Sequence, residues 1–165
     1  MSIDENKAVA KKLFGEVFNN RRVELVDELV AEDFVDHNRI IFAQPEGPGG
    51  VAEGIRMLLA AFPDMSAAIE RLVGEEDCVV AKVRMAETNT GSYPRVPGPT
   101  GRYAEWDSMG LARIEDGKIA ELWGISDRMG MLTQLGILPD IGRCRCASFA
   151  DLHLETTARE SSVGP

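Results

Sequence analysis

Apolar residues in the first part of the chain recur at three- and four-residue spacing, which is typical of amphipathic helices. One such series covers residues 6–18, and a shorter one covers residues 23–30. A third covers residues 51–62, after a glycine- and proline-rich segment at residues 47–50. We therefore predict three N-terminal helices, with residues 32–38 forming a brief extended segment or turn between the second and the third.

After the third predicted helix the apolar period changes to two, which indicates β-strands. Residues 67–73 and 78–85 fit two antiparallel strands, and residues 103–114 and 118–125 fit a longer hairpin. The connection at residues 115–117 ends in glycine and predicts a three-residue turn with a bulge. The order of elements gives an α+β fold, with a mostly antiparallel sheet.

In the predicted hairpin we expect Ile114 to pair with Lys118, which would set Gly110 opposite Leu122. One face of the hairpin would then carry mainly small residues, which leave space either for close helix packing or for a ligand pocket. Both faces hold apolar side chains, so helices should cover one face and a partner subunit the other. We expect a homodimer through the second face. The first face holds Trp106, Ser108, Gly110, Ala112, Ala120, Leu122 and Gly124, and the apolar residues of the second are Met109, Leu111, Trp123 and Ile125.

Length and composition predict one domain, residues 1–139, followed by a flexible C-terminal tail, residues 140–165. A formal net charge of −9 argues against binding to nucleic acid, whose phosphates require clustered Lys and Arg. No apolar run approaches the ~20 residues of a membrane span, and no secretory signal is readable at the start. We therefore expect a cytoplasmic protein without a membrane segment.

The cysteines and histidines do not form a metal-binding pattern. Cys144 and Cys146 lack the second pair of ligands that a tetrahedral zinc site needs, and the chain has only His37 and His153. Cys78 stands alone in an apolar run. We expect neither a metal site nor a disulfide framework.

Asp36 and His37 are the main candidates for acid–base chemistry. Histidine titrates near neutral pH, as a general acid or base requires. Adjacent side chains of an extended segment point to opposite sides, so both can face one cavity only if the chain turns there. In the structural alternative, Asp36 and Asn38 bond to the local backbone. Asp127 precedes a predicted short helix, where capping of the helix N-terminus is its natural role.

Three segments, residues 34–38, 98–102 and 113–123, together with Asp127 and Gln134-Leu135-Gly136, resemble the SnoaL-like polyketide cyclase family. The resemblance spans about residues 6–138. It implies a cone-shaped fold of the nuclear-transport-factor-two-like kind, in which three helices pack on a curved sheet around a deep apolar pocket. It also implies frequent dimers.

Cyclases of this family use no cofactor. An Asp on the last strand acts as their acid–base group, and a His on the preceding strand helps to hold an enolate. The matching positions here are Gly124 and Gly110, and the family's Thr-His-Thr-Gly motif is similar to Thr88-Asn89-Thr90-Gly91. By this resemblance His37 becomes the strongest acid–base candidate, assisted by Asp36 or Asp127. The residues expected to bind substrate are Asn89, Ser108, Trp106, Phe34 and Leu122.

The resemblance implies a cofactor-independent enzyme of secondary metabolism, such as antibiotic biosynthesis. It would act as a lyase-type cyclase or an isomerase on a hydrophobic, polyketide-type small molecule, by proton transfer. One alternative is an epoxide-opening cyclase or hydrolase, since carboxylates activate water or alcohols. Another is a non-catalytic small-molecule-binding or dimerisation module, which the loss of two family acid–base positions favours.

Overall fold

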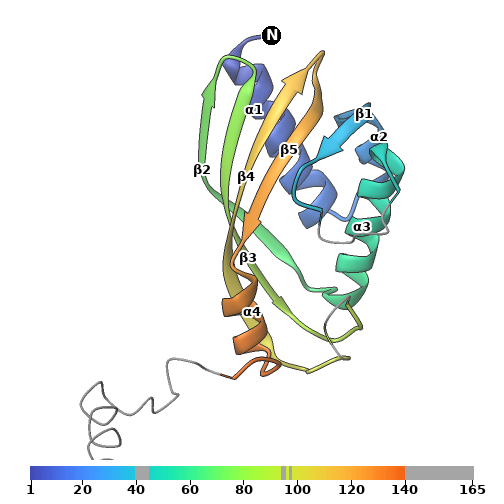
Figure 1. Ribbon diagram of the computed structural model, residues 1–165, viewed down its shortest axis with the longest axis vertical. Helices are drawn as coiled ribbons and strands as arrows, with labels where there is room; N and C mark the ends of the chain where they lie inside the picture. Colours follow the sequence, from blue (N-terminus) through green and yellow to red (C-terminus); the bar gives the residue numbers. More distant parts are fainter. Residues whose placement is uncertain (40–44, 94–95, 97, 140–165) are drawn as a thin grey trace, which may run out of the picture.

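The computed structural model of the chain describes residues 1–39, 45–93, 96 and 98–139 (Figure 1). The predicted tail, residues 140–165, lies outside the described residues. None of the helices in the described part of the chain is both long and apolar enough to cross a membrane.

The N-terminal helices follow the predicted periodicity, with one irregularity. Helix α1, Ile3–Lys12, starts with a capping box in which Ser2 and Glu5 satisfy each other's backbone N–H groups. It continues into a π-helix, η1, Leu13–Asn19. The second predicted helix is a 3₁₀ turn, η2, Val23–Leu25, followed by the short α2, Val26–Leu29. Helix α3 covers Gly47–Ala61 and has Pro48 in its first turn, where no backbone N–H is needed.

Five strands form one curved, mixed sheet in the order β1-β5-β4-β3-β2. Strand β1 runs parallel to β5, and the other neighbours are antiparallel. The expected α+β fold is confirmed. The strands are β1, Val30–Asp36; β2, Ser66–Glu75; β3, Cys78–Thr88; β4, Tyr103–Glu115; and β5, Lys118–Ser126, after which helix α4 covers Arg128–Gln134.

The register predicted for the β4–β5 hairpin is wrong by one position at the turn and by two positions beyond a bulge. Asp116 and Gly117 both have positive φ, so the turn closes with two residues and Glu115 pairs with Lys118. Ala120 is then the extra residue of a β-bulge, because the pairing shifts before Glu121. An even shift keeps each side chain beyond the bulge on its predicted face.

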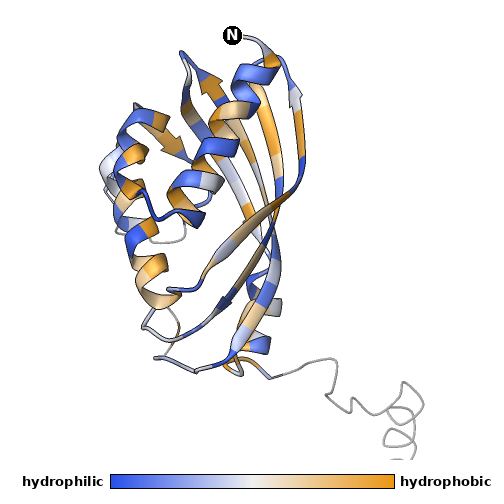
Figure 2. Cartoon of the chain, turned by 180° about the vertical axis from the view of Figure 1, so that it is seen from behind, coloured by the Kyte–Doolittle hydropathy of each residue, from blue (hydrophilic) through white to orange (hydrophobic). Residues whose placement is uncertain are grey.

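The core lies between the sheet and the N-terminal helices. Hydrophilic and hydrophobic bands alternate along these helices (Figure 2), as expected for helices with one buried face. Val17 and Val26 from the helical side, and Phe62 after α3, are fully buried. On the opposite face of the sheet, Met109 and Ile125 remain 50% and 77% exposed.

Candidate functional site

A cavity of about 170 Å³ lies between the helices and the inner face of the sheet. Its wall is apolar except for two side chains, the carboxylate of Asp36 and the phenol of Tyr93, among the described residues that line it. Such a cavity suits a hydrophobic ligand with a few polar groups. Phe18, Phe34, Ile55, Leu58, Ile119 and Leu122 form most of the apolar wall.

Strand alternation on β1 places Asp36 in the cavity wall. Asp36 pairs with Leu122 of β5, and Phe34, two residues earlier, faces the same cavity. Oδ1 of Asp36 accepts a 2.9 Å hydrogen bond from the backbone N–H of Asn38. Within the described chain no further hydrogen bond to this carboxylate is found, so Oδ2 is available to a ligand.

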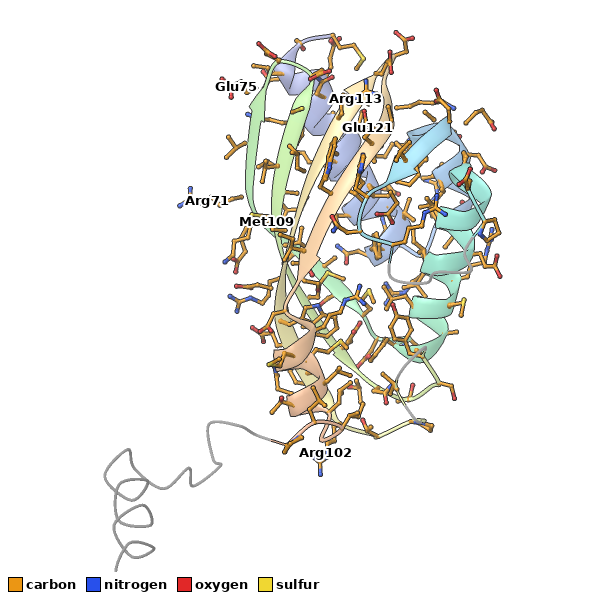
Figure 3. All side chains as sticks on the ribbon, in the orientation of Figure 1. Arg71, Glu75, Arg102, Met109, Arg113 and Glu121 are labelled. Carbon is orange, nitrogen blue, oxygen red and sulfur yellow. The ribbon has the colours of Figure 1, made fainter. Side chains whose placement is uncertain are left out.

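His37 lies on the other face of the sheet, away from the cavity. Its ring stacks on Trp123 with 4.2 Å between the ring centroids, and Nε2 is 2.8 Å from Oε2 of Glu121. Arg113 donates to the second oxygen of Glu121, and these two side chains lie close together in Figure 3. The hydrogen bonds from His37 and Arg113 lower the pKa of Glu121. The predicted placement of His37 in the pocket is therefore corrected, because β1 stays extended through Asp36 and neighbouring side chains alternate.

Asp127 and Asn89 stabilise the fold away from the cavity wall. Asp127 caps α4 by accepting a 2.9 Å hydrogen bond from the N–H of Gly130, as its position predicts. Asn89 is fully buried, accepts from the N–H of Thr100 at 2.8 Å and donates to the carbonyl of Gly91 at 2.9 Å. The side-chain amide of Asn89, which we expected to bind substrate, is thus already hydrogen-bonded to the backbone.

The remaining predicted binding residues divide into two groups. Phe34 and Leu122 line the cavity. Trp106 is buried in the core, with its ring edge-on to Phe62 at 6.4 Å between centroids. Ser108 forms a 2.7 Å hydrogen bond with Ser126. Neither Trp106 nor Ser108 is among the residues that line the cavity.

Gly110 and Gly124 pair directly across β4 and β5 and share the inward face with Ala112 and Leu122. A Cβ atom at Gly124 would meet nothing within 4 Å, and one at Gly110 would meet only Leu122, at 3.4 Å. These are the positions that the family resemblance assigns to an acid–base pair. The structure therefore leaves space there in place of two functional side chains.

Two polar residues, Tyr93 in the cavity wall and the buried Glu87, escaped the sequence analysis. Glu87 continues the buried alternation of β3, after Val83 and Met85, and is 1% exposed. The signal in the sequence was a carboxylate at a position where strand alternation predicts a buried apolar residue. Tyr93 belongs to a glycine- and proline-rich loop that has no periodicity to reveal its orientation.

Solved structures with the same fold include TsrD from Streptomyces laurentii, with a TM-score of 0.76 and 22% identity over 84% of this chain and 99% of that chain. AclR from Streptomyces galilaeus, a proposed hydroxylase, has a TM-score of 0.71 and 26% identity over 84% of this chain and all of that chain (100%). IdmH from Streptomyces antibioticus, a proposed polyketide cyclase, has a TM-score of 0.67 and 32% identity, covering 79% of this chain and 98% of that chain. No curated protein matches the sequence.

These similarities agree with the cone-shaped fold of the nuclear-transport-factor-two-like kind, here with an open sheet. A sequence model of SnoaL-like polyketide cyclases matches residues 8–135, which include every described strand, the whole of α3 and α4, and the second half of α1. The chain belongs to the SnoaL-like polyketide cyclase family.

Proposed function

We propose that this protein is a cofactor-independent enzyme that cyclises or isomerises a hydrophobic, polyketide-type small molecule by proton transfer. The observation that carries the proposal is the Asp36 carboxylate in the cavity wall, which is apolar apart from Asp36 and Tyr93 among the described residues. A carboxylate there can remove a proton from a carbon next to a carbonyl group and return it elsewhere on the ligand.

The surroundings of Asp36 suit this chemistry. Few polar groups compete with the ligand, since Tyr93 is the other polar side chain in the described wall. Electrostatic interactions are stronger in such an apolar environment than in water, so a hydrogen bond to a developing enolate oxygen gains strength. Membership of the cyclase family and 32% identity to IdmH support the same substrate class.

The test is hydrogen–deuterium exchange at the acidic carbon of 2-tetralone, a bicyclic ketone, followed by NMR in D₂O. In this assay the base removes a proton from carbon, the enolate forms, and a deuteron from solvent replaces the proton. Asp36→Asn keeps an oxygen acceptor for the N–H of Asn38 but cannot take up the proton. We expect the enzyme-dependent rate to fall by roughly 100-fold or more in this variant.

Asp33→Asn is the matched control, because Asp33 is exposed on the same strand. It should exchange at the wild-type rate. Wild-type exchange no faster than buffer alone, or an equal loss in both variants, would contradict the proposal.

The second candidate function is ligand binding without catalysis. It is favoured by the Gly110–Gly124 pair, which leaves no functional side chain at the two family acid–base positions. This alternative predicts that 2-tetralone binds, seen as shifted NMR signals, while its exchange rate stays at background.

A further inference from the structure

Glu87 is a buried carboxyl group that has no partner in the described protein. It lies on the inward side of β3, is 1% exposed, and neither oxygen has a hydrogen-bond partner among the described residues. Leaving a buried polar group unpaired destabilises a protein, so such groups call for an explanation.

Of the charged groups around Glu87, Arg21 favours the ionised form, but by less than Asp64 opposes it. The guanidinium of Arg21 donates to the backbone carbonyls of Phe18, Pro63 and Met65. The other nearby charge, Asp64, is itself negative and accepts a 2.8 Å hydrogen bond from the N–H of Thr88. Burial, with a smaller contribution from Asp64, raises the pKa of Glu87 to about 8, so the carboxyl is mostly neutral at pH 7.

The charge of Glu87 acts on a residue of the cavity wall, Tyr93. Its ring lines the cavity and packs edge-to-face with Phe62, with 5.7 Å between the ring centroids. Its hydroxyl makes no hydrogen bond within the described chain. Burial raises the pKa of Tyr93, Arg128 lowers it, and a negative charge on Glu87 raises it further. The phenol is therefore protonated and sensitive to the charge state of Glu87.

We propose that Tyr93 forms a proton-donating end of the cavity that holds an enolate or phenolate oxygen of the ligand, supported by the buried, unpartnered carboxyl of Glu87. Tyr93 contacts the oxygen, and Glu87, which does not line the cavity, acts as a positioning residue by keeping negative charge out of this end. An apolar site can hold a carboxylic acid neutral in this way, and neutral donors stabilise an oxyanion well in a medium of low dielectric. The inference rests on the proposed function, because it assumes a ligand with such an oxygen in the same cavity.

The probe for this site is 4-nitrophenol, whose phenolate absorbs visible light, and 4-nitroanisole is the matched compound without an ionisable oxygen. Affinities are measured by equilibrium dialysis at pH 6.5 and pH 9.5 for wild type, Glu87→Gln, Tyr93→Phe and the double variant. Comparing proteins at one pH cancels the ionisation of the probe itself.

At pH 6.5 Glu87→Gln should bind 4-nitrophenol as wild type does. At pH 9.5 it should bind severalfold more tightly, because the wild-type carboxylate then repels the phenolate. Tyr93→Phe should lose roughly 10- to 100-fold in affinity for 4-nitrophenol, the value of one hydrogen bond to a charged oxygen, and little for 4-nitroanisole. In the Tyr93→Phe background, Glu87→Gln should change binding less than it does in wild type.

Glu75→Gln, at an exposed position of β2, is the control and should follow wild type at both pH values. Circular dichroism confirms that each variant is folded, and Glu87→Met replaces Glu87→Gln if the latter does not fold. Identical pH dependence in wild type and Glu87→Gln, or an equal effect of Tyr93→Phe on both probes, would overturn the inference.

The outcomes also separate this inference from the proposed function. Unchanged 4-nitrophenol binding in these variants, with exchange still lost in Asp36→Asn, would refute the oxygen-binding end alone. The expected binding changes, with exchange unaffected by Asp36→Asn, would refute the catalytic proposal alone.

Discussion

Replacing Glu87 by Gln should stabilise the protein at alkaline pH and leave its stability at pH 4 nearly unchanged. Gln has almost the shape of the neutral acid but cannot ionise. In wild type the ionised form of Glu87 would be buried at 1% exposure with no partner among the described residues. Folding therefore opposes the loss of the Glu87 proton.

The size of the effect follows from the pKa of Glu87, which is about 8 in the folded protein against an ordinary value of 4.5. Below pH 4.5 both states are protonated, and the favourable contribution of the neutral acid is fully present. Between these values the unfolded chain releases a proton that the folded protein keeps, so the free energy of unfolding falls by ~1.36 kcal/mol for each pH unit. The difference between 8 and 4.5 multiplied by this slope gives a total loss of roughly 5 kcal/mol, which is complete once the pH exceeds 8.

Urea unfolding, followed by tryptophan fluorescence from pH 4 to pH 9, measures this directly. The free energy of unfolding of Glu87→Gln minus that of wild type should increase steadily up to pH 8 and then level off. Titrating groups that do not interact with Glu87 contribute equally to both proteins and cancel. A difference that does not change with pH would show that Glu87 ionises as readily in the folded protein as in the unfolded chain, and would refute the reasoning.

Three further predictions concern the sheet and the loop that follows β3. His37→Gln should change the 2-tetralone exchange rate by less than about twofold, because the ring faces away from the cavity; a loss like that of a catalytic residue would return His37 to the mechanism. Asn89→Ala should lower the free energy of unfolding by about 1–3 kcal/mol in urea titrations, since it leaves buried backbone groups unpaired, and an unchanged midpoint would contradict this. We propose a homodimer through the sheet face that carries Met109 and Ile125, whose burial would contribute ~25 cal/mol per Å² of apolar area. Light scattering should then show a dimer for wild type and a monomer for Ile125→Glu, and a monomeric wild type would rule the dimer out.

The sequence by itself determined the elements whose signals are local. Helical and strand periodicities depend on residues within a few positions of each other, and they predicted the three N-terminal helical segments and the four antiparallel strands. The helix-capping role of Asp127 is equally local. The two faces of the β4–β5 hairpin were also predicted, because strict alternation is independent of an even shift in register.

The tertiary structure alone decided which of these residues share a site. Strand β1 lies parallel to β5, which is distant in sequence, and this pairing turns Asp36 toward the cavity and His37 toward Trp123 and Glu121. The register of the hairpin depended on a positive φ at Asp116 and a bulge, neither of which periodicity encodes. Alternation could place Glu87 inward, but whether a buried carboxyl finds a partner depends on every element packed around it. Those contacts join residues far apart along the chain, and a local pattern carries no information about them.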